Sequence, residues 1–198
     1  MTASMSRAFF GPPRTRGEII VGVSGSTLVL ALLGVYIGHT GGWRGWSTLQ
    51  TVVLAVMLFD LIFGIFTISS VTAKRWYHRD GARRFRLGFV IAHVVLYLLP
   101  FAALFDAGWV WAVVNAAMLV GAAVVIESTP LNLKGVVALC LVLALGLVNL
   151  IWLPLPAALA WLPILLPVKV VLCFLVPDIP PVTAENDVSA PKFEKTSL

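Results

Sequence analysis

The chain has 198 residues, of which 60% are hydrophobic and 12% are charged, and its mean hydropathy is +0.98. Soluble domains carry about twice this share of charged residues, so the composition excludes a soluble domain with one anchor and predicts an integral membrane protein. The formal net charge is +5. The basic residues gather in the N-terminal arm, one loop and the tail, which indicates membrane topology and not nucleic-acid binding.

The N-terminal arm, residues 1–17, is polar and basic, and we expect it to be disordered. The first hydrophobic segment follows at 18–38. It is longer than the apolar core of a cleavable signal peptide, which spans about 7–15 residues. Because a membrane-spanning helix needs about 20 apolar residues, we expect 18–38 to cross the bilayer.

Five further segments pass the same length test. Glycine-rich, proline-rich or charged stretches separate them, and proline in particular cannot continue a helix. The chain is therefore predicted to be an all-α integral membrane protein, a bundle of six transmembrane helices over 18–177 with a disordered tail at 178–198. The five segments are 49–72, 86–107, 109–127, 133–152 and 156–176.

Basic residues near the ends of the segments predict the orientation. If the N-terminus lies in the cytoplasm, Arg44 is the one basic residue left on the outside. Six of the seven tryptophans then fall at or near the outer ends, where the bilayer interface favours them. We therefore expect both termini in the cytoplasm and the protein in the plasma membrane.

Charged residues within spanning helices are rare and are functional-site hypotheses by default. At 1.5 Å per residue, Asp60 would lie about 18 Å from the cytoplasmic end of its helix, His93 about 10 Å and Lys169 about 12 Å. These depths would allow the three side chains to meet. Asp60 shares a helix face with Gly64 and Thr67 at the spacing i, i+4, i+7, which predicts that the acid faces protein and not lipid.

Tyr97 follows His93 by four residues, so both should lie on one helix face. A polar set at membrane depth could bind a substrate or simply hold helices in register, since buried ion pairs can serve specificity without net stability. Glu127, at the inner end of its segment, is expected to be solvated. The predicted substrate-binding residues are Asp60, Thr67, His93, Tyr97 and Lys169.

The loop over 73–85 and the adjoining Arg86 hold the densest charge in the chain, and their first role is to orient the protein. Clustered cations with aromatic neighbours at the cytoplasmic face also suit anionic lipid headgroups, or the phosphate of a lipid-like substrate. The residues expected to contact such headgroups are Arg75, Arg79, Arg83 and Arg84.

Three classes of function stay open from the sequence. The first is a permease or lipid-handling protein that acts on a lipid-like or small ionic substrate. The second is an intramembrane enzyme of terpene-cyclase-like chemistry, in which Asp60 is the general acid on an isoprenoid or lipid and aromatic faces stabilise carbocations. The third is a structural subunit of a membrane complex. The aromatic residues of the second hypothesis are Phe59, Phe63, Phe66 and Tyr97.

The sequence indicates no cofactor. Cys140 and Cys173 lie inside apolar runs and have no disulfide or metal-ligand spacing. Histidine and carboxylate pairs suited to haem or to two metal ions do not occur in the sequence, nor does a glycine-rich phosphate loop. The expected partners are the lipid bilayer and anionic lipids at the cytoplasmic face, with no nucleic acid, and the oligomeric state stays open.

Overall fold

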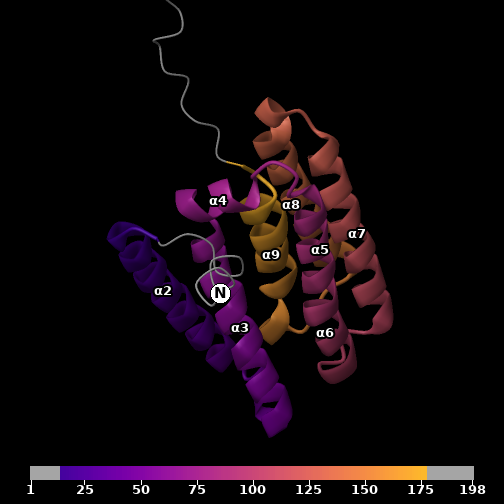
Figure 1. Cartoon of the computed structure of the whole chain (residues 1–198). Coiled ribbons are helices and arrows are strands. Elements are labelled where there is room, and N and C mark those ends of the chain that lie inside the picture. Colours follow the sequence, from indigo (N-terminus) through magenta and orange to yellow (C-terminus); the bar gives the residue numbers. More distant parts are fainter. Residues whose placement is uncertain (1–13, 178–198) are drawn as a thin grey trace, which may run out of the picture.

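The computed structural model of the chain describes residues 14–177, and within this range every regular element is a helix (Figure 1). Six helical segments are long and apolar enough to cross a membrane, which confirms the all-helical prediction and the number of segments. The expected disordered tail at 178–198, and the expected arm up to residue 13, lie outside the described residues.

The first two long helices, α2 (Arg16–Thr40) and α3 (Thr48–Ile68), each begin with a capping box. In α2 the Glu18 amide donates to the Thr15 hydroxyl (3.2 Å), and the Thr15 amide donates to the Glu18 carboxylate (2.9 Å). This reciprocal pair satisfies two amides at the helix N-terminus. The helix therefore starts two residues before the expected boundary at 18.

The prediction that the second segment runs to residue 72 is wrong. Helix α3 ends at Ile68, and Ser70 accepts a hydrogen bond from the Ala73 amide to cap a separate helix, α4 (Val71–Tyr77). Figure 1 shows α4 lying across the end of the bundle. Part of the expected loop at 73–85 is therefore helical. Serine favours such a break because its hydroxyl replaces backbone partners at a helix start.

Two of the six segments contain a π-helical stretch. The third segment runs through α5 (Arg83–His93), the π-helix η2 (Val94–Leu98) and α6 (Leu99–Leu104). Proline lies near each π-helix: Pro100 in the first turn of α6 and Pro167 at the end of α9. Proline removes a donor and crowds the preceding turn, and a widened turn relieves that conflict. The sixth segment comprises η4 (Ala157–Leu159), α9 (Leu162–Pro167) and η5 (Val168–Phe174).

The sixth segment is the most buried of the six and the first is the least buried. Helices α3, α5, α7 and α8 all contact η5, whereas α2 packs on α3 and η4 at the edge of the bundle. Figure 1 shows α9 between α3 and α5. Residues of η5 therefore lie where several helices meet. The remaining elements are η1 (Gly42–Gly45), α7 (Trp109–Ser128), η3 (Leu131–Leu133) and α8 (Lys134–Trp152).

A buried polar network joins α7 to α8. Asn149 Nδ2 donates to Asn115 Oδ1 (2.8 Å), and Asn115 Nδ2 donates back to Asn149 Oδ1 (3.1 Å). The indole of Trp111 also donates to Asn149 Oδ1 (2.9 Å). Trp111 lies in the first turn of α7 and is buried, so its indole takes part in this helix contact. Such amide pairs hold helices together in an apolar environment.

Candidate functional site

Asp60 and Lys169 form an ion pair between α3 and η5. Lys169 Nζ lies 2.6 Å from Asp60 Oδ2 and also donates to the Asp60 backbone carbonyl (3.0 Å). Asp60 is eight residues from the end of α3 at Ile68, a rise of about 12 Å, which is less than the 18 Å expected from the longer helix. The two side chains, whose expected depths would allow a contact, therefore meet.

The two partners differ in exposure. The Lys169 side chain is 1% exposed, whereas the Asp60 side chain is 59% exposed. The expectation that the acid faces protein is therefore wrong for the carboxylate itself. Gly64, on the same helix face, does lie against protein, because a Cβ on this glycine would lie 2.6 Å from Lys169 Nζ. Gly64 leaves the space that the lysine occupies, and Asp60 reaches the same lysine from the edge of the helix contact.

Tyr97, in the π-helix η2, is the third member of the cluster. Its hydroxyl donates to Asp60 Oδ2 (2.6 Å) and lies 3.2 Å from the Met57 carbonyl oxygen. Lys169 Nζ lies 5.5 Å from the centroid of the Tyr97 ring, within the range of a cation–π contact. One carboxylate oxygen of Asp60 thus accepts two donors. Among the described residues, the other oxygen accepts no hydrogen bond.

His93 adjoins this cluster without bonding to Asp60 or Lys169. Its Nδ1 donates to the Phe89 carbonyl oxygen (2.9 Å), because a carbonyl can only accept. The imidazole and the Tyr97 ring stack with centroids 5.8 Å apart. The expected direct contact of His93 with the ion pair is therefore not found. Of the predicted set, Asp60, Tyr97 and Lys169 are joined by hydrogen bonds, and His93 supports Tyr97.

A groove of about 530 Å³ runs along the exposed side of α3 and includes Asp60. Thr67 lines its far end, and its hydroxyl donates to the Gly64 carbonyl oxygen (3.3 Å). Phe59 and Phe63 line the groove and stack with ring centroids 4.3 Å apart. We name this surface the α3 groove. Its lining residues are Ala55, Val56, Phe59, Asp60, Phe63, Gly64 and Thr67.

Phe66 does not belong to the α3 groove. A Cβ on Gly25 of α2 would lie 2.6 Å from the Phe66 ring, so this ring packs in the contact between α2 and α3. Of the four aromatic residues expected near the acid, Phe59, Phe63 and Tyr97 are there. The α3 groove therefore combines an open carboxylate with two stacked aromatic rings.

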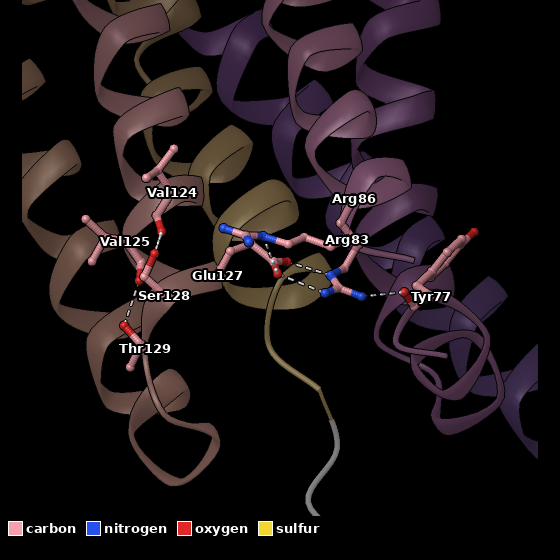
Figure 2. A network of polar contacts seen from close by, with 8 residues as sticks. All are labelled: Tyr77, Arg83, Arg86, Val124, Val125, Glu127, Ser128 and Thr129. Carbon is pink, nitrogen blue, oxygen red and sulfur yellow. Dashed lines mark hydrogen bonds and ion pairs between the residues drawn. The ribbon is translucent and has the colours of Figure 1, made fainter. Parts of the chain in front are cut away.

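A second polar region lies at the end of the bundle where α4 meets α5. Arg86 binds Glu127 through two hydrogen bonds, from Nε (2.6 Å) and Nη2 (2.8 Å), and Nη1 donates to the Tyr77 carbonyl oxygen (3.1 Å). The Glu127 side chain is 2% exposed, so the expectation that it is solvated is wrong. Figure 2 shows Glu127 between Arg86 and Arg83, whose Nε lies 4.0 Å from the carboxylate.

A pocket of about 540 Å³ adjoins this pair, and we name it the basic pocket. Of the four arginines expected to contact headgroups, Arg75, Arg79 and Arg83 line it, whereas Arg84 on the same helix as Arg83 does not. Sequence reasoning missed Lys134, because it lies at the start of α8, 48 positions after Arg86 in the sequence. The sequence feature that could have identified Lys134 is its positive charge at the start of a predicted helix, on the same predicted side of the membrane as the basic loop.

His78 lines the basic pocket and connects it to η5. Its Nε2 lies 2.9 Å from the Phe174 carbonyl oxygen and therefore donates to it. Burial lowers the pKa of the His78 imidazole below its ordinary value, although the bond to Phe174 acts in the opposite direction. The imidazole is thus neutral near pH 7, and the pocket owes its positive charge to lysine and arginine.

Within residues 14–177, no three His, Cys, Asp or Glu side chains lie together in a way that could hold a metal ion. No protein-family model matches the chain, and neither a curated protein nor a solved structure is significantly similar to it. The two polar regions therefore have to be interpreted from their own chemistry.

Proposed function

We propose that the protein is a multi-pass membrane permease or lipid-handling protein and that the α3 groove is its working site. The observation that supports this proposal is the ion pair of Asp60 and Lys169, in which the lysine side chain is buried and the acid side chain is exposed. In the proposed orientation both termini lie in the cytoplasm of a plasma-membrane protein, because basic residues gather at that end.

The exposure of Asp60 favours a binding role over a purely structural one. An ion pair that only holds two helices in register is best enclosed, because a charge open to hydrocarbon is costly. Here Lys169 is enclosed, but the Asp60 carboxylate opens into the α3 groove. Its second oxygen stays available to a ligand while the first is held by Lys169 and Tyr97. This arrangement suits a site that exchanges partners.

The chemistry of the α3 groove favours an amphipathic substrate with a cationic group. A carboxylate attracts a cation, and the faces of Phe59 and Phe63 can bind it through cation–π contacts. A bound cation would place two positive charges beside Asp60, so we expect Lys169 to release its proton in exchange. The groove opens sideways from α3, which would let such a molecule enter from the bilayer.

Transport by purified protein in liposomes tests the proposal. Uptake of radiolabelled methyltriphenylphosphonium, driven by an imposed pH gradient, would be compared between wild type and Asp60→Asn. We expect the variant to fall to the level of protein-free liposomes. The matched control is Asp106→Asn, the same chemical change in the loop after α6, where asparagine tolerates the positive φ of 54°. Equal uptake by wild type and by folded Asp60→Asn would contradict the proposal.

The enzyme hypothesis has weaker support. A general acid must carry its own proton, whereas both neighbours of Asp60 donate hydrogen bonds to it, as a carboxylate requires. Phe59 and Phe63 could stabilise a carbocation, and this feature keeps the alternative testable. Mass spectrometry after incubation with polyprenyl substrates would reveal an Asp60-dependent product if the protein is an enzyme. A structural subunit would instead copurify with a stable partner from native membranes.

A further inference from the structure

The basic pocket gathers cations from separate elements of the chain. Six of its lining residues are lysine or arginine, and one, Asp80, is acidic. They come from α4, from the turn before α5, from α5 itself and from the start of α8. The six basic residues are Lys74, Arg75, Arg79, Arg83, Arg86 and Lys134.

Membrane orientation does not require this convergence. The rule that basic residues favour the cytoplasmic side depends on their number near the segment ends, not on whether they share a pocket. Arg84 illustrates the difference, because it lies on the same helix as Arg83 and both are exposed, but only Arg83 lines the pocket. Like charges brought together repel one another, so a pocket of this composition is best stabilised by an anion.

Two contacts hold the wall of the pocket in place. Arg86 is buried and uses all three side-chain nitrogens, two on Glu127 and one on the Tyr77 carbonyl. Glu127 is therefore held mainly by Arg86, with Arg83 Nε at 4.0 Å from the same carboxylate, and one carboxylate cannot offset the charge of all six basic residues. Arg79 donates to the Trp76 carbonyl oxygen (2.7 Å), and its guanidinium lies 4.2 Å from the Trp76 ring centroid. Stacking of this kind leaves the other edge of an arginine open to a ligand.

We propose that the basic pocket binds the phosphate group of an anionic molecule. Phosphate supplies several acceptor oxygens and up to two negative charges, and arginine binds it through paired hydrogen bonds. The pocket lies at the end of the bundle, next to segments that are long enough to cross a bilayer. The phosphate can therefore belong to a lipid headgroup or to a soluble compound, and one experiment distinguishes the two sources.

The test uses the full chain in dodecyl maltoside at constant ionic strength, with thermal unfolding measured against ligand concentration. Pyrophosphate is the soluble probe, and dioctanoyl phosphatidic acid is the lipid probe. Dioctanoyl phosphatidylcholine, with the same chains, is the zwitterionic control. Saturable stabilisation by pyrophosphate alone assigns a soluble ligand, and saturable stabilisation by phosphatidic acid alone assigns a lipid headgroup. Stabilisation by both supports the shared phosphate chemistry.

Neighbouring arginines supply the matched variants. We expect Arg83→Gln and Arg79→Gln each to raise the dissociation constant about tenfold, because each removes a charge-assisted hydrogen bond to the ligand. Arg84→Gln removes the same charge one position away and should change affinity less than about twofold, since Arg84 does not line the pocket and acts on it only through solvent, where salt screens the charge. Unfolding without ligand verifies that each variant is folded.

Two results would overturn the proposal: no saturable binding of either probe to the wild type, or equal weakening by Arg84→Gln and Arg83→Gln. The second result would mean that the probes respond to overall charge and not to the pocket. Asp60→Asn should bind both probes as the wild type does. The phosphate site can therefore fail or succeed independently of the function proposed for the α3 groove.

Discussion

Lys169 and Asp60 form an ion pair in which the lysine is enclosed by the bundle and the acid opens into the α3 groove. This asymmetry predicts unequal costs of removing each partner. Asp60→Ala leaves an unpaired ammonium in the interior, which should reduce the free energy of unfolding by about 3 kcal/mol. Lys169→Met leaves an Asp60 carboxylate that still accepts the Tyr97 hydrogen bond and is exposed on one side. This variant should therefore lose less unfolding free energy than Asp60→Ala.

Unfolding of both variants in a mixed-micelle denaturant titration measures this difference. The double variant Asp60→Asn/Lys169→Met serves as the control, because it removes both charges and should recover much of the stability lost in Asp60→Ala. A larger loss in Lys169→Met than in Asp60→Ala would show that the enclosed lysine is not the costly charge.

Gly64→Ala should disturb the ion pair of Asp60 and Lys169 without changing any charged residue. The added Cβ would lie 2.6 Å from Lys169 Nζ, so the end of this enclosed side chain would have to shift from the position in which it binds Asp60. We expect a loss of about 1–3 kcal/mol in unfolding free energy, as for other overpacked sites. Gly121→Ala in α7 is the matched control, because its Cβ would meet nothing within 4 Å. It should be neutral or stabilising by up to about 1 kcal/mol, and equal losses in the two variants would exclude a specific effect at Lys169.

The asparagine network between α7 and α8 should contribute to stability but not to transport. Asn149→Leu leaves the Trp111 indole and Asn115 without their buried partner, at a cost of about 1–3 kcal/mol per unsatisfied group. Asn115→Leu/Asn149→Leu should lose less than the sum of the two single variants, because it removes both amides. Thermal unfolding and liposome uptake measured together check both statements. Transport lost in a stable Asn149 variant would assign the network to the substrate path.

His78 should make stability depend on pH below about 6.5. Its pKa is lowered by burial, with the charges of Arg86 and Lys134 acting in the same direction and Glu127 and the Phe174 carbonyl opposing them. The unfolded chain therefore binds a proton that the folded chain does not, so this contribution to stability is complete above the ordinary value of 6.5 and is lost as pH falls below it.

The variant His78→Gln keeps a donor for the Phe174 carbonyl oxygen and removes the titration. Between pH 7.5 and pH 5, wild type should lose more unfolding free energy than His78→Gln, by the sign argument above. Parallel pH profiles of the two proteins would show that His78 does not carry this dependence.

Apolar length was enough to predict six helices, because a bilayer sets a narrow range for a spanning segment. Depth along each helix also allowed Asp60 and Lys169 to meet, and the structure brings them together. The break at Ser69–Ser70 was missed, because serine within an apolar run can continue a helix or cap the next one. Local sequence does not decide between the two outcomes.

The direction of each polar side chain was the least predictable feature. Helical spacing shows that Asp60 and Gly64 share a face, but not that Lys169 covers the glycine and leaves the acid at the edge. Similarly, Arg83 and Arg84 are equivalent in the sequence, and only the packing of α5 against α7 separates them. These features depend on the rotational orientation of each helix relative to its neighbours, and the hydrophobic periodicity of a single sequence does not determine that orientation.

Labelling of Asp60 by a lipid-soluble carbodiimide tests the central claim most directly. Dicyclohexylcarbodiimide reaches carboxyl groups from the bilayer and reacts with them when they carry a proton, which Asp60 can take from Lys169. Peptide mass spectrometry locates the product, and we count as labelling either the N-acylurea of Asp60 or the amide that its activated carboxyl forms with Lys169, whose Nζ lies 2.6 Å away. We predict that Asp60 is labelled, that the enclosed Glu127 is not, and that methyltriphenylphosphonium slows the labelling of Asp60. An unlabelled Asp60, or labelling that is unchanged by the cation, would contradict a substrate site in the α3 groove.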